Sequence, residues 1–432
     1  MSAPSAVHDA HPPVPLPSSL SVGALAWRSV TAAGRAFARL SPPTDVAMHP
    51  DASRIAAAYR SERHLLIDGS SPGAWSSLSR FWPVADGWVR THGNYPHHAT
   101  ALRTGLALSA SAGADDVAAR LRELSMSAAV SAIGSVGGLC VPVRTEDPAP
   151  DAALRQHPIV ATERLGDAPP RRLPTASAAQ PLRGVRVLDL TRVIAGPVAT
   201  RTLALAGAEV LRIDAPQRPE FTWQHLDTGH GKRTALLDIR AQPDRLEQLL
   251  AGADAVVLGY RPDGLRRLGL APHALASRHP HLVIAQLTAW PGADSPRGFD
   301  SLVQAESGIA WLESPDGGDT PGALPAQALD HSAGYLLAAG IADALRRRAD
   351  EGGTWTVRTS LRRVAAELLG MPRGEAARTV GDPPADPVTQ SFDVDGQRVT
   401  TAVPAVVWPG SPTLYAPPRA WGRDAPEWLP TP

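Results

Sequence analysis

The stretch LRGVRVLDLTRVIAGPVATRTLALAGAEVLRIDAP, residues 182–216, decides the fold class of this chain. It opens with the apolar run VRVLDL (185–190), passes through a glycine–proline turn into a helical segment, and closes with a second apolar run, EVLRI (209–213). Short buried strands joined by a helix are typical of a parallel sheet that is covered on both faces. The stretch therefore predicts an α/β domain that begins near Leu182.

The same alternation of apolar runs and helical segments continues to residue 361. Apolar runs of this length, bounded by helical periodicity, favour buried parallel strands. We therefore predict a doubly wound, Rossmann-like parallel sheet for residues 182–361. The further elements expected are strands at 255–259, 282–287 and 355–361, and helices around 199–205, 244–250 and 272–277, from Ser301, and over 331–347.

Composition divides the rest of the chain. Residues 1–20 are rich in Pro, Ser and Ala without periodicity, which predicts a disordered leader. Residues 21–145 mix helical stretches with a strand–turn–strand pattern and predict a smaller α+β domain placed N-terminally. Residues 146–181 are rich in Pro and Ala and are expected to be a linker. The Pro-rich stretch 362–432 is expected to wrap over a surface.

Size and charge narrow the classes of function. The chain has 432 residues, enough to bury a core that keeps water from a reaction site. Lys plus Arg and Asp plus Glu each total 42, so no net charge attracts the chain to nucleic acid or anionic lipid. Arg, Asp or Pro interrupts each apolar stretch before it reaches the length of a membrane span. We expect neither nucleic-acid nor membrane partners.

Cysteine usage and the N-terminus indicate the compartment. Cys140 is the single cysteine and cannot form an internal disulfide. The first residues, MSAPSAVHDAHPPVPLP, lack the basic and apolar regions of a signal peptide. Both observations predict a cytoplasmic protein.

The turn after the first strand excludes one large class of Rossmann-like enzymes. A nicotinamide dinucleotide site requires G-x-G-x-x-G at this turn, because the backbone must approach the pyrophosphate closely. The chain has TRVIAGPVAT (191–200) instead. We therefore do not expect a nicotinamide-dependent dehydrogenase.

Six motifs in order resemble the family III CoA-transferases. The opening signature of that family is a strand, an A-G-P turn and G-A-x-V-(I/L)-(K/R)-(I/V)-(E/D)-x-P, and residues 182–216 are similar to it. The resemblance covers residues 182–361. The other five motifs are GHGKRTALLDIR (229–240), ADAVVLGYRPDGLRRLGL (253–270), HPHLVIAQLTAW (279–290), RGFDSLVQAESG (297–308) and ALDHSAGYLLAAGIADALRRRADEGGTWTVRTSL (328–361).

The resemblance implies that Asp330 is a catalytic nucleophile. Asp at the start of a helix is often only a cap, but Asp330 matches the position of the family's catalytic aspartate. Such a carboxylate attacks an acyl-CoA thioester, forms an acyl-aspartyl anhydride and then an aspartyl-CoA thioester, and a second carboxylate collects the CoA. We expect the helix dipole to keep Asp330 ionised at neutral pH. The resemblance also implies an interlocked homodimer.

The resemblance also implies residues that contact coenzyme A, the co-substrate. Lys232 is the one lysine in the chain, and a compact ammonium is not simply replaced by a planar guanidinium. We expect Lys232, Arg267 and Arg297 to bind the phosphates and pantetheine. Arg192 and Ala195, in the turn after the first strand, are expected to contact the same molecule. No metal is expected, since His97 and His98 lack metal-ligand spacing.

The chain departs from the family pattern in several places. Racemases of the family carry a histidine where this chain has Phe299, so racemase chemistry is disfavoured. Ala215 matches an arginine that some formyl-CoA transferases use. The family's small domain follows its catalytic helix, whereas the similar stretch PVADGWVRTHGNYPHH (83–98) precedes the large domain here. We interpret this order as a permutation, and we find no glycine-rich run matching the family's active-site loop.

Two alternatives remain open. GSSPG (69–73) satisfies G-x-S-x-G after a strand-like run, which would make Ser71 the nucleophile of a serine hydrolase if a helix followed at once. The polar stretch after Pro72 argues against such a helix. A degenerate family member that binds CoA without turnover is the other alternative.

Overall fold

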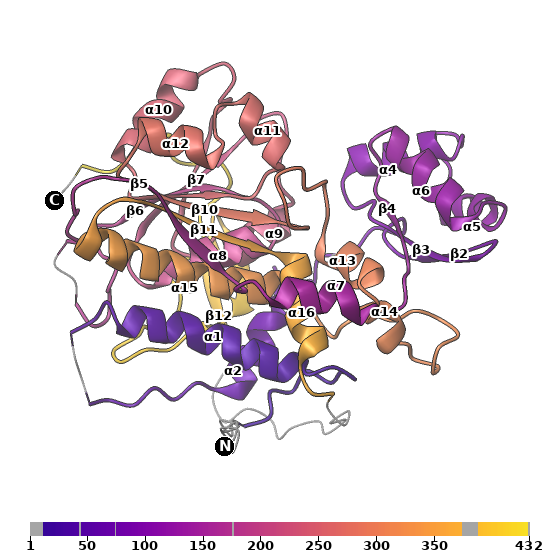
Figure 1. Cartoon of the computed structure of the whole chain (residues 1–432), viewed down its shortest axis with the longest axis horizontal. Helices are drawn as coiled ribbons and strands as arrows, with labels where there is room; N and C mark the ends of the chain where they lie inside the picture. The colour runs from indigo at the N-terminus through magenta and orange to yellow at the C-terminus, as the bar shows by residue number, and fades with distance from the viewer. Residues whose placement is uncertain (1–11, 43–44, 74, 175–176, 374–387, 431–432) are drawn as a thin grey trace.

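A seven-stranded sheet forms the centre of the computed structural model, which describes residues 12–42, 45–73, 75–174, 177–373 and 388–430 (Figure 1). Six strands run parallel, and β5 at one edge runs antiparallel to its neighbour β11. In spatial order the strands are β5 (Ala161–Gly166), β11 (Thr354–Ser360), β10 (Val283–Thr288), β9 (Ala255–Leu258), β6 (Arg186–Leu190), β7 (Glu209–Asp214) and β8 (Arg233–Leu236).

The strand order confirms the predicted doubly wound α/β class. Across the sheet the parallel strands run β8, β7, β6, β9, β10, β11, so the chain starts in the middle and winds outward in both directions. The five strands predicted from apolar runs are present within one residue of their expected bounds. Winding reverses between β6 and β9, and ligands of open parallel sheets bind outside the carboxyl ends of the strands at such a point.

Two strands of this sheet have no clear pattern in the sequence. β8 is only four residues long, RTAL, and its first two side chains are polar, so it shows neither an apolar run nor alternation. β5 (ATERLG) lies within 146–181, the segment expected to be a linker, together with α7 (Pro148–Arg155). That segment therefore supplies an edge strand to the sheet by pairing with β11.

Helices cover both faces of the sheet, and each face has its own apolar core. One face carries α8 (Ala195–Leu205), α15 (Ala328–Glu351) and α1 (Val22–Ala38). The other carries α10 (Pro243–Gly252), α11 (Pro262–Arg267) and α12 (Pro272–Arg278). In β10, Ala285 packs into the first core and Ile284 into the second, because successive strand residues point to opposite faces.

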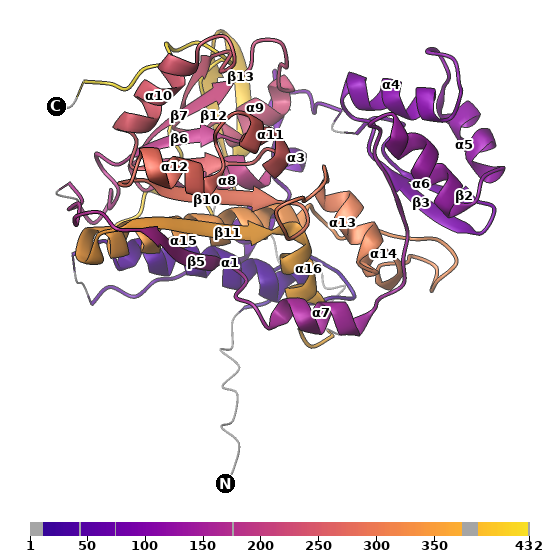
Figure 2. The same ribbon diagram turned by 45° about the horizontal axis from the view of Figure 1, so that its top comes forward.

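The connection from β10 to β11 runs over an unusual face of the sheet. The preceding connection, from β9 to β10, passes over one face through α11 and α12, whereas α15 lies on the opposite face beside α8 (Figures 1 and 2). Both connections step in the same direction across the sheet, so they have opposite hands, although parallel crossovers are nearly always right-handed. As a result, this crossover places no helix over the α11 side of β10 and β11.

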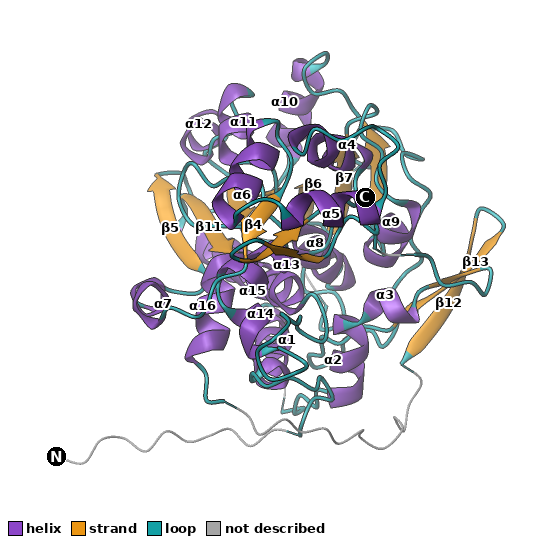
Figure 3. Ribbon diagram, turned by 90° about the vertical axis from the view of Figure 1, so that its right-hand side faces the viewer, coloured by secondary structure: helices purple, strands orange, loops and turns teal. Residues whose placement is uncertain are grey.

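Strands from the N-terminal and C-terminal parts of the described chain form a small sheet beside the large one. β1 (Leu66–Ile67) pairs with β13 (Gln397–Ala402). β13 in turn pairs with β12 (Thr389–Val394), and Figure 3 shows these two strands. The stretch beyond β13, expected to wrap a surface, reaches β8, where the Asp424 N–H donates to the carbonyl of Thr234. The helices near this small sheet are α2 (Ala52–Tyr59) and α3 (Ser61–His64), whereas α16 (Leu361–Gly370) packs against α7.

Residues from about 78 to 143 form a lobe with its own apolar core. The lobe stands to one side of the large sheet, next to α13 (Asp300–Glu306) and α14 (Ile309–Leu312) (Figure 2). Its elements are β2 (Phe81–Val84), β3 (Gly87–Thr91), β4 (Cys140–Pro142), α4 (Pro96–Gly105), α5 (Ala114–Arg122) and α6 (Met126–Ser135). The first part of the expected N-terminal domain, including α1, packs instead on α15.

The described part of the N-terminal segment is attached to the large domain by hydrogen bonds. The hydroxyls of Ser18 and Ser19 donate to the carboxylate of Glu313, at 2.6 and 2.8 Å. Residues 1–11 of the expected leader lie outside the described residues. Within the part of the chain that the structure describes, no helix has the length and apolarity needed to cross a membrane.

We expect Gly334→Ala to loosen the contact between α8 and α15. A Cβ at this position would lie 2.6 Å from the carbonyl oxygen of Ala195, so one helix must shift. Overpacking of this kind costs about 1–3 kcal/mol of unfolding free energy, measurable by urea denaturation. Gly264→Ala in α11 is the control, because open space surrounds it and alanine is the better helix former. Equal stability of the two variants would contradict this prediction.

Candidate active site

Asp330 lies inside the first turn of α15, not before the helix as expected. The helix begins at Ala328, and Asp330 is 7% exposed. Its backbone N–H donates to the carboxylate of Asp300, at 2.9 Å, and Asp300 in turn accepts a hydrogen bond from the Gln304 amide. Asp300, the first residue of α13, therefore caps the N-terminus of α15 and leaves the side chain of Asp330 for another role.

The Asp330 and Asp300 carboxyls form a buried pair. Burial, and then the neighbouring charge of Asp300, raise the pKa of Asp330 well above its ordinary value. Burial also raises the pKa of Asp300 to about 6, although its hydrogen bonds oppose the change. Two carboxylates this close resist ionising together. The direction of the Asp330 shift is opposite to the one expected from the helix dipole alone, because burial outweighs the dipole.

The carboxylate of Asp330 has no hydrogen-bonding partner among the described residues. Its neighbours along α15 are occupied otherwise: Ser332 bonds to the hydroxyl of Tyr59 at 2.8 Å, and the ring of His331 packs against the same tyrosine. Burial, and then the charge of Arg201, lower the pKa of His331 to about 3, so this imidazole is neutral. A buried carboxyl without a partner is costly, and such groups gather at functional sites.

The lobe reaches this carboxylate pair through its β3–α4 loop. The ring of His92 stacks on Phe299 with centroids 3.7 Å apart, and Phe299 immediately precedes Asp300. Tyr95, from the same loop, stacks on Phe221 of the large domain. The stretch 83–98, which we interpret as part of a permuted small domain, is therefore joined to Asp330 through Phe299 and Asp300.

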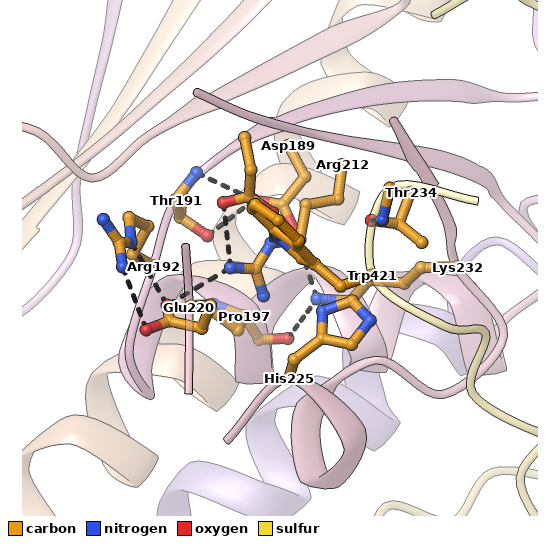
Figure 4. A network of polar contacts seen from close by, with 12 residues as sticks. Asp189, Thr191, Arg192, Pro197, Arg212, Glu220, His225, Lys232, Thr234 and Trp421 are labelled. Atoms are coloured by element: carbon orange, nitrogen blue, oxygen red, sulfur yellow. Dashed lines mark hydrogen bonds and ion pairs between the residues drawn. The ribbon is translucent and has the colours of Figure 1, made fainter. Parts of the chain in front are cut away.

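A second buried carboxylate, Asp189 near the end of β6, organises the turn that leads into α8 (Figure 4). One oxygen accepts the Thr191 backbone N–H at 3.0 Å and the Thr191 hydroxyl. The other accepts the Thr200 hydroxyl at 2.6 Å and the ammonium of Lys232 at 3.1 Å. This single side chain therefore connects the end of β6, the body of α8 and the start of β8.

Lys232 points into this network and not into solvent. Its side chain is 1% exposed, and its ammonium also donates to the carbonyl of Pro197 at 2.8 Å. Burial lowers the pKa of Lys232 to about 8, although Asp189 opposes the change. These contacts give Lys232 a structural role, since a compact ammonium and a planar guanidinium place their donors differently. Binding of a CoA phosphate by Lys232 stays a prediction.

Glu220 connects the loop after β6 to the lobe. Its carboxylate binds Arg212 at 3.2 Å and Arg192 at 3.1 Å, and it accepts the Tyr95 hydroxyl at 2.7 Å. Burial alone would raise the pKa of Glu220, but the two arginines outweigh it and lower the pKa to about 2. Arg192, expected to contact CoA, is thus committed to an internal ion pair, as Figure 4 shows.

Glu220 also stabilises strained backbone at the same loop. Val193 has a φ of 73°, which is unfavourable for a β-branched residue, and its N–H donates to Glu220 at 3.2 Å. Ala195 follows as the first residue of α8 and is buried, with its carbonyl against Gly334. The loop therefore has one fixed shape beside the first turns of α15. Strain of this kind clusters at functional sites.

Arginines gather at the carboxyl edge of the sheet. Arg297 lies 3.4 Å from the His98 ring nitrogen and 3.3 Å from the carbonyl of Gly137, both in the lobe. Burial, and then the charges of Arg261 and Arg218, lower the pKa of Arg297. Arg218 and Arg261, missed in the sequence, lie four residues after β7 and three residues after β9, and a cation in the loop after a buried strand was the available signal.

Two other candidates are not brought to this edge by any described contact. Arg267, at the end of α11, is 69% exposed and pairs with Asp263 one turn earlier. Ser71 is exposed, and neither 71–73 nor 75–80 forms a helix, so the strand–turn–helix geometry of a hydrolase elbow is missing from these residues.

Residues 182–394 match the sequence profile of CoA-transferase family III. This region of the chain belongs to that family. The match begins at Leu182, where the large domain was predicted to begin, and extends beyond 361 through β12. Asp330, Asp300, Asp189 and Glu220 therefore all lie inside the region shared with the CoA-transferase family.

Curated relatives of the CoA-transferase region are themselves CoA-transferases by name. The probable fatty acyl-CoA transferase Rv3272 of Mycobacterium tuberculosis is 33% identical over 216 residues, 45% of this chain and 54% of that protein. Cinnamoyl-CoA:phenyllactate CoA-transferase of Clostridium sporogenes is 32% identical over 211 residues, 44% of this chain and 50% of that protein. The chain therefore spans about half the length of these relatives.

Solved structures of the family overlap with part of this chain. The crystal structure of Rv3272 is 34% identical with a TM-score of 0.41, covering 44% of this chain and 56% of that one. A CAIB/BAIF family protein from Brucella suis is 23% identical with the same TM-score, covering 51% and 65%. Superpositions at this score do not bear on the fold, which the strand order establishes.

We expect Asp330→Asn to stabilise the protein at neutral and alkaline pH. The pKa of Asp330 is raised in the folded state, so the cost of burying it grows as pH rises from the unfolded pKa, about 4, through the folded pKa. Asparagine removes this cost. The gain in Tm should increase with pH and vanish near pH ~4. Asp350→Asn, at the exposed end of the same helix, should show no such gain, and a pH-independent gain at Asp330 would refute the assignment.

We expect Lys232→Met to destabilise the protein by about 3–5 kcal/mol, because it leaves Asp189 buried and short of its closest countercharge. Asp189→Asn should also lower the free energy of unfolding, because it leaves the ammonium of Lys232 buried without its countercharge. The double variant should cost clearly less than the sum of the two, as measured by denaturant unfolding in a double-mutant cycle. Additive losses would show that the two groups are not coupled.

Proposed function

We propose that the protein transfers coenzyme A between an acyl-CoA thioester and a carboxylate, with Asp330 as the nucleophile and aspartyl-CoA as the intermediate. The observation that carries the proposal is the Asp330 carboxyl itself: it is buried, without a hydrogen-bonding partner among the described residues, and paired with Asp300 inside the family region. The names of the relatives support CoA transfer in general.

The chemistry uses the carboxylate twice. The Asp330 carboxylate attacks the thioester carbonyl, the C–S bond breaks, and CoA leaves as a thiolate from a mixed anhydride. The thiolate attacks the Asp330 carbonyl of that anhydride, which releases the free acid and forms aspartyl-CoA. An acceptor carboxylate then takes the place of the released acid, and the same two steps in reverse yield the new acyl-CoA and restore Asp330.

The surroundings of Asp330 support this role. A raised pKa makes the carboxylate a stronger nucleophile once it is ionised, and the partner Asp300 accepts the backbone N–H of Asp330 in a fixed position. The first turn of α15 is buried, and α8 and α13 pack against this helix. Exclusion of water protects an anhydride from hydrolysis.

The arginines at the carboxyl edge are the proposed partners of the CoA phosphates. Arg218, Arg261 and Arg297 lie in the connections that follow β7, β9 and β10, on the carboxyl side of the sheet where ligands of this fold class bind. Each guanidinium can hold a phosphate through two parallel hydrogen bonds. Of the residues expected from the sequence, Arg297 fits this arrangement best. Lys232 and Arg192 are proposed to support the loop beneath it, and Arg267 to act only at its rim.

We propose an interlocked homodimer working in the cytoplasm, where the buried thiol of Cys140 stays reduced. Racemisation is not proposed, because Phe299 offers no titratable group and stacks on His92. The neutral overall charge supports small anionic substrates rather than nucleic acid or membrane as partners.

We expect Asp330→Asn to lower the rate of CoA transfer by on the order of 10³-fold or more, because it removes the nucleophile. The assay is a panel of acyl-CoA donors and carboxylate acceptors followed by mass spectrometry of the CoA products. With a productive donor, hydroxylamine should convert Asp330 to a hydroxamate in the parent protein and not in the variant. Asp350→Asn, in the last turn of the same helix, should retain activity and labelling.

The same assay separates the alternatives. Full transfer activity of the Asp330→Asn variant would end the proposed mechanism. CoA binding without turnover by the parent protein, with all donors, would instead indicate a degenerate family member. Hydrolysis of the acyl-CoA donors that is lost in Ser71→Ala but kept in Asp330→Asn would favour the serine hydrolase.

A further inference from the structure

A cavity of about 470 Å³ lies on the side of the large sheet away from α15. Its floor includes Gln286 and Thr288 of β10 and Thr356 and Arg358 of β11. The residues that alternate with these, such as Val357, pack into the core beneath α15. The sheet therefore separates this cavity from the helix that carries Asp330.

The unusual crossover explains why the cavity exists. Had the β10–β11 connection run on the same face as α11 and α12, its helix would cover this part of the sheet. Instead, this part of the sheet stays uncovered. The walls of the cavity come from α11, α12 and the stretch between α7 and β5. The apolar wall residues are Leu154, Pro158, Ile159, Leu165, Pro262, Leu265, Ala271, Pro272, Pro291 and Ala293.

The ionisable side chains that line the cavity are all basic. Three arginines and two histidines line it, and neither Asp nor Glu is among its lining residues. Each arginine meets a carboxylate outside the cavity: Arg266 meets Asp263 and Asp294, Arg363 meets Glu367, and Arg358 meets Glu163. The cavity itself thus presents hydrogen-bond donors over apolar walls, which suits an anion with an apolar body.

Two side chains on the floor, Arg358 and Gln286, have hydrogen-bond donors that no described residue uses. Arg358 uses one nitrogen on Glu163, at 2.7 Å, whereas all three nitrogens of Arg363 are engaged by His157 and Glu367. Gln286 stands directly opposite Arg358 in the β10–β11 register. Among the described residues, no group hydrogen-bonds to the Gln286 amide. A guanidinium beside a free amide can bind both oxygens of one carboxylate.

We infer that this cavity binds an organic monocarboxylate with an alkyl or aryl body, with its carboxylate on Arg358 and Gln286 and its apolar part between Leu265 and Ile159. The site is separate from Asp330, and the inference does not rest on the proposed CoA transfer. Cavities of this size enclose most of a small organic ligand. Partial competition from Glu163 for Arg358 sets the affinity.

Binding to the full-length protein tests the inference first. Butanoate, hexanoate and octanoate, with 1-hexanol and 1-octanol as uncharged analogues, are titrated by calorimetry and by ligand-observed NMR. The acids should bind, with affinity rising roughly fourfold for each added methylene that enters the apolar walls. The alcohols should bind on the order of tenfold more weakly than the acids of equal length. Equal affinity of acids and alcohols, or no binding of octanoate, would overturn the inference.

Variants with opposite expected signs locate the site. Arg358→Gln should weaken octanoate on the order of tenfold, because it removes the charged donor. Glu163→Gln should tighten octanoate several-fold, because it frees the same guanidinium from its competitor. Arg164→Gln is the matched control, since this neighbouring β5 arginine pairs with Asp167 and does not line the cavity, and it should leave binding unchanged.

The two signs keep the test decisive even if one variant folds poorly. Arg358 and Glu163 are both about half exposed, and unfolding curves of each variant show whether the fold survives. A Glu163→Gln protein that binds octanoate no tighter than the parent would overturn the inference. So would an Arg164→Gln protein that loses as much affinity as Arg358→Gln.

Discussion

The buried carboxylate of Asp189 is the interaction on which the rest of the site depends. Removed from water at the end of β6, it must be neutralised and hydrogen-bonded, and Lys232, Thr191 and Thr200 meet that need. In doing so they fix the β6–α8 turn against the start of β8. The direction in which α8 leaves the sheet, and hence the place where Gly334 lets α15 cross it, follows from this network.

The site combines several features that cost stability. Asp330 and Asp300 share a buried space, Val193 holds a positive φ, and Glu220 is buried between two arginines and Tyr95. Such features persist only where surrounding structure over-determines them. Here the surroundings come from the lobe, whose β3–α4 loop docks on the large domain by aromatic stacking and one tyrosine hydrogen bond. The surroundings of the Asp330–Asp300 pair therefore include a lobe that precedes both residues in the chain.

The hand of one crossover separates two regions of the same sheet. Because α15 runs on the α8 face, its first turn reaches the loop after β6 and brings Asp330 to the switch point. The same choice leaves the opposite side of β10 and β11 uncovered and open to the basic, apolar cavity. A crossover of the usual hand would have covered the cavity and removed Asp330 from the site.

The sequence by itself determined the α/β class, five parallel strands and the family region from Leu182, because apolar periodicity and ordered motifs are local signals. It could not reveal β8 or β5, whose short polar strands are stabilised only by their neighbours. Tertiary structure alone paired Asp300 with Asp330 and turned Lys232 inward to Asp189. Burial and partners set the pKa and the direction of a charged side chain, and both arise from residues far apart in the chain.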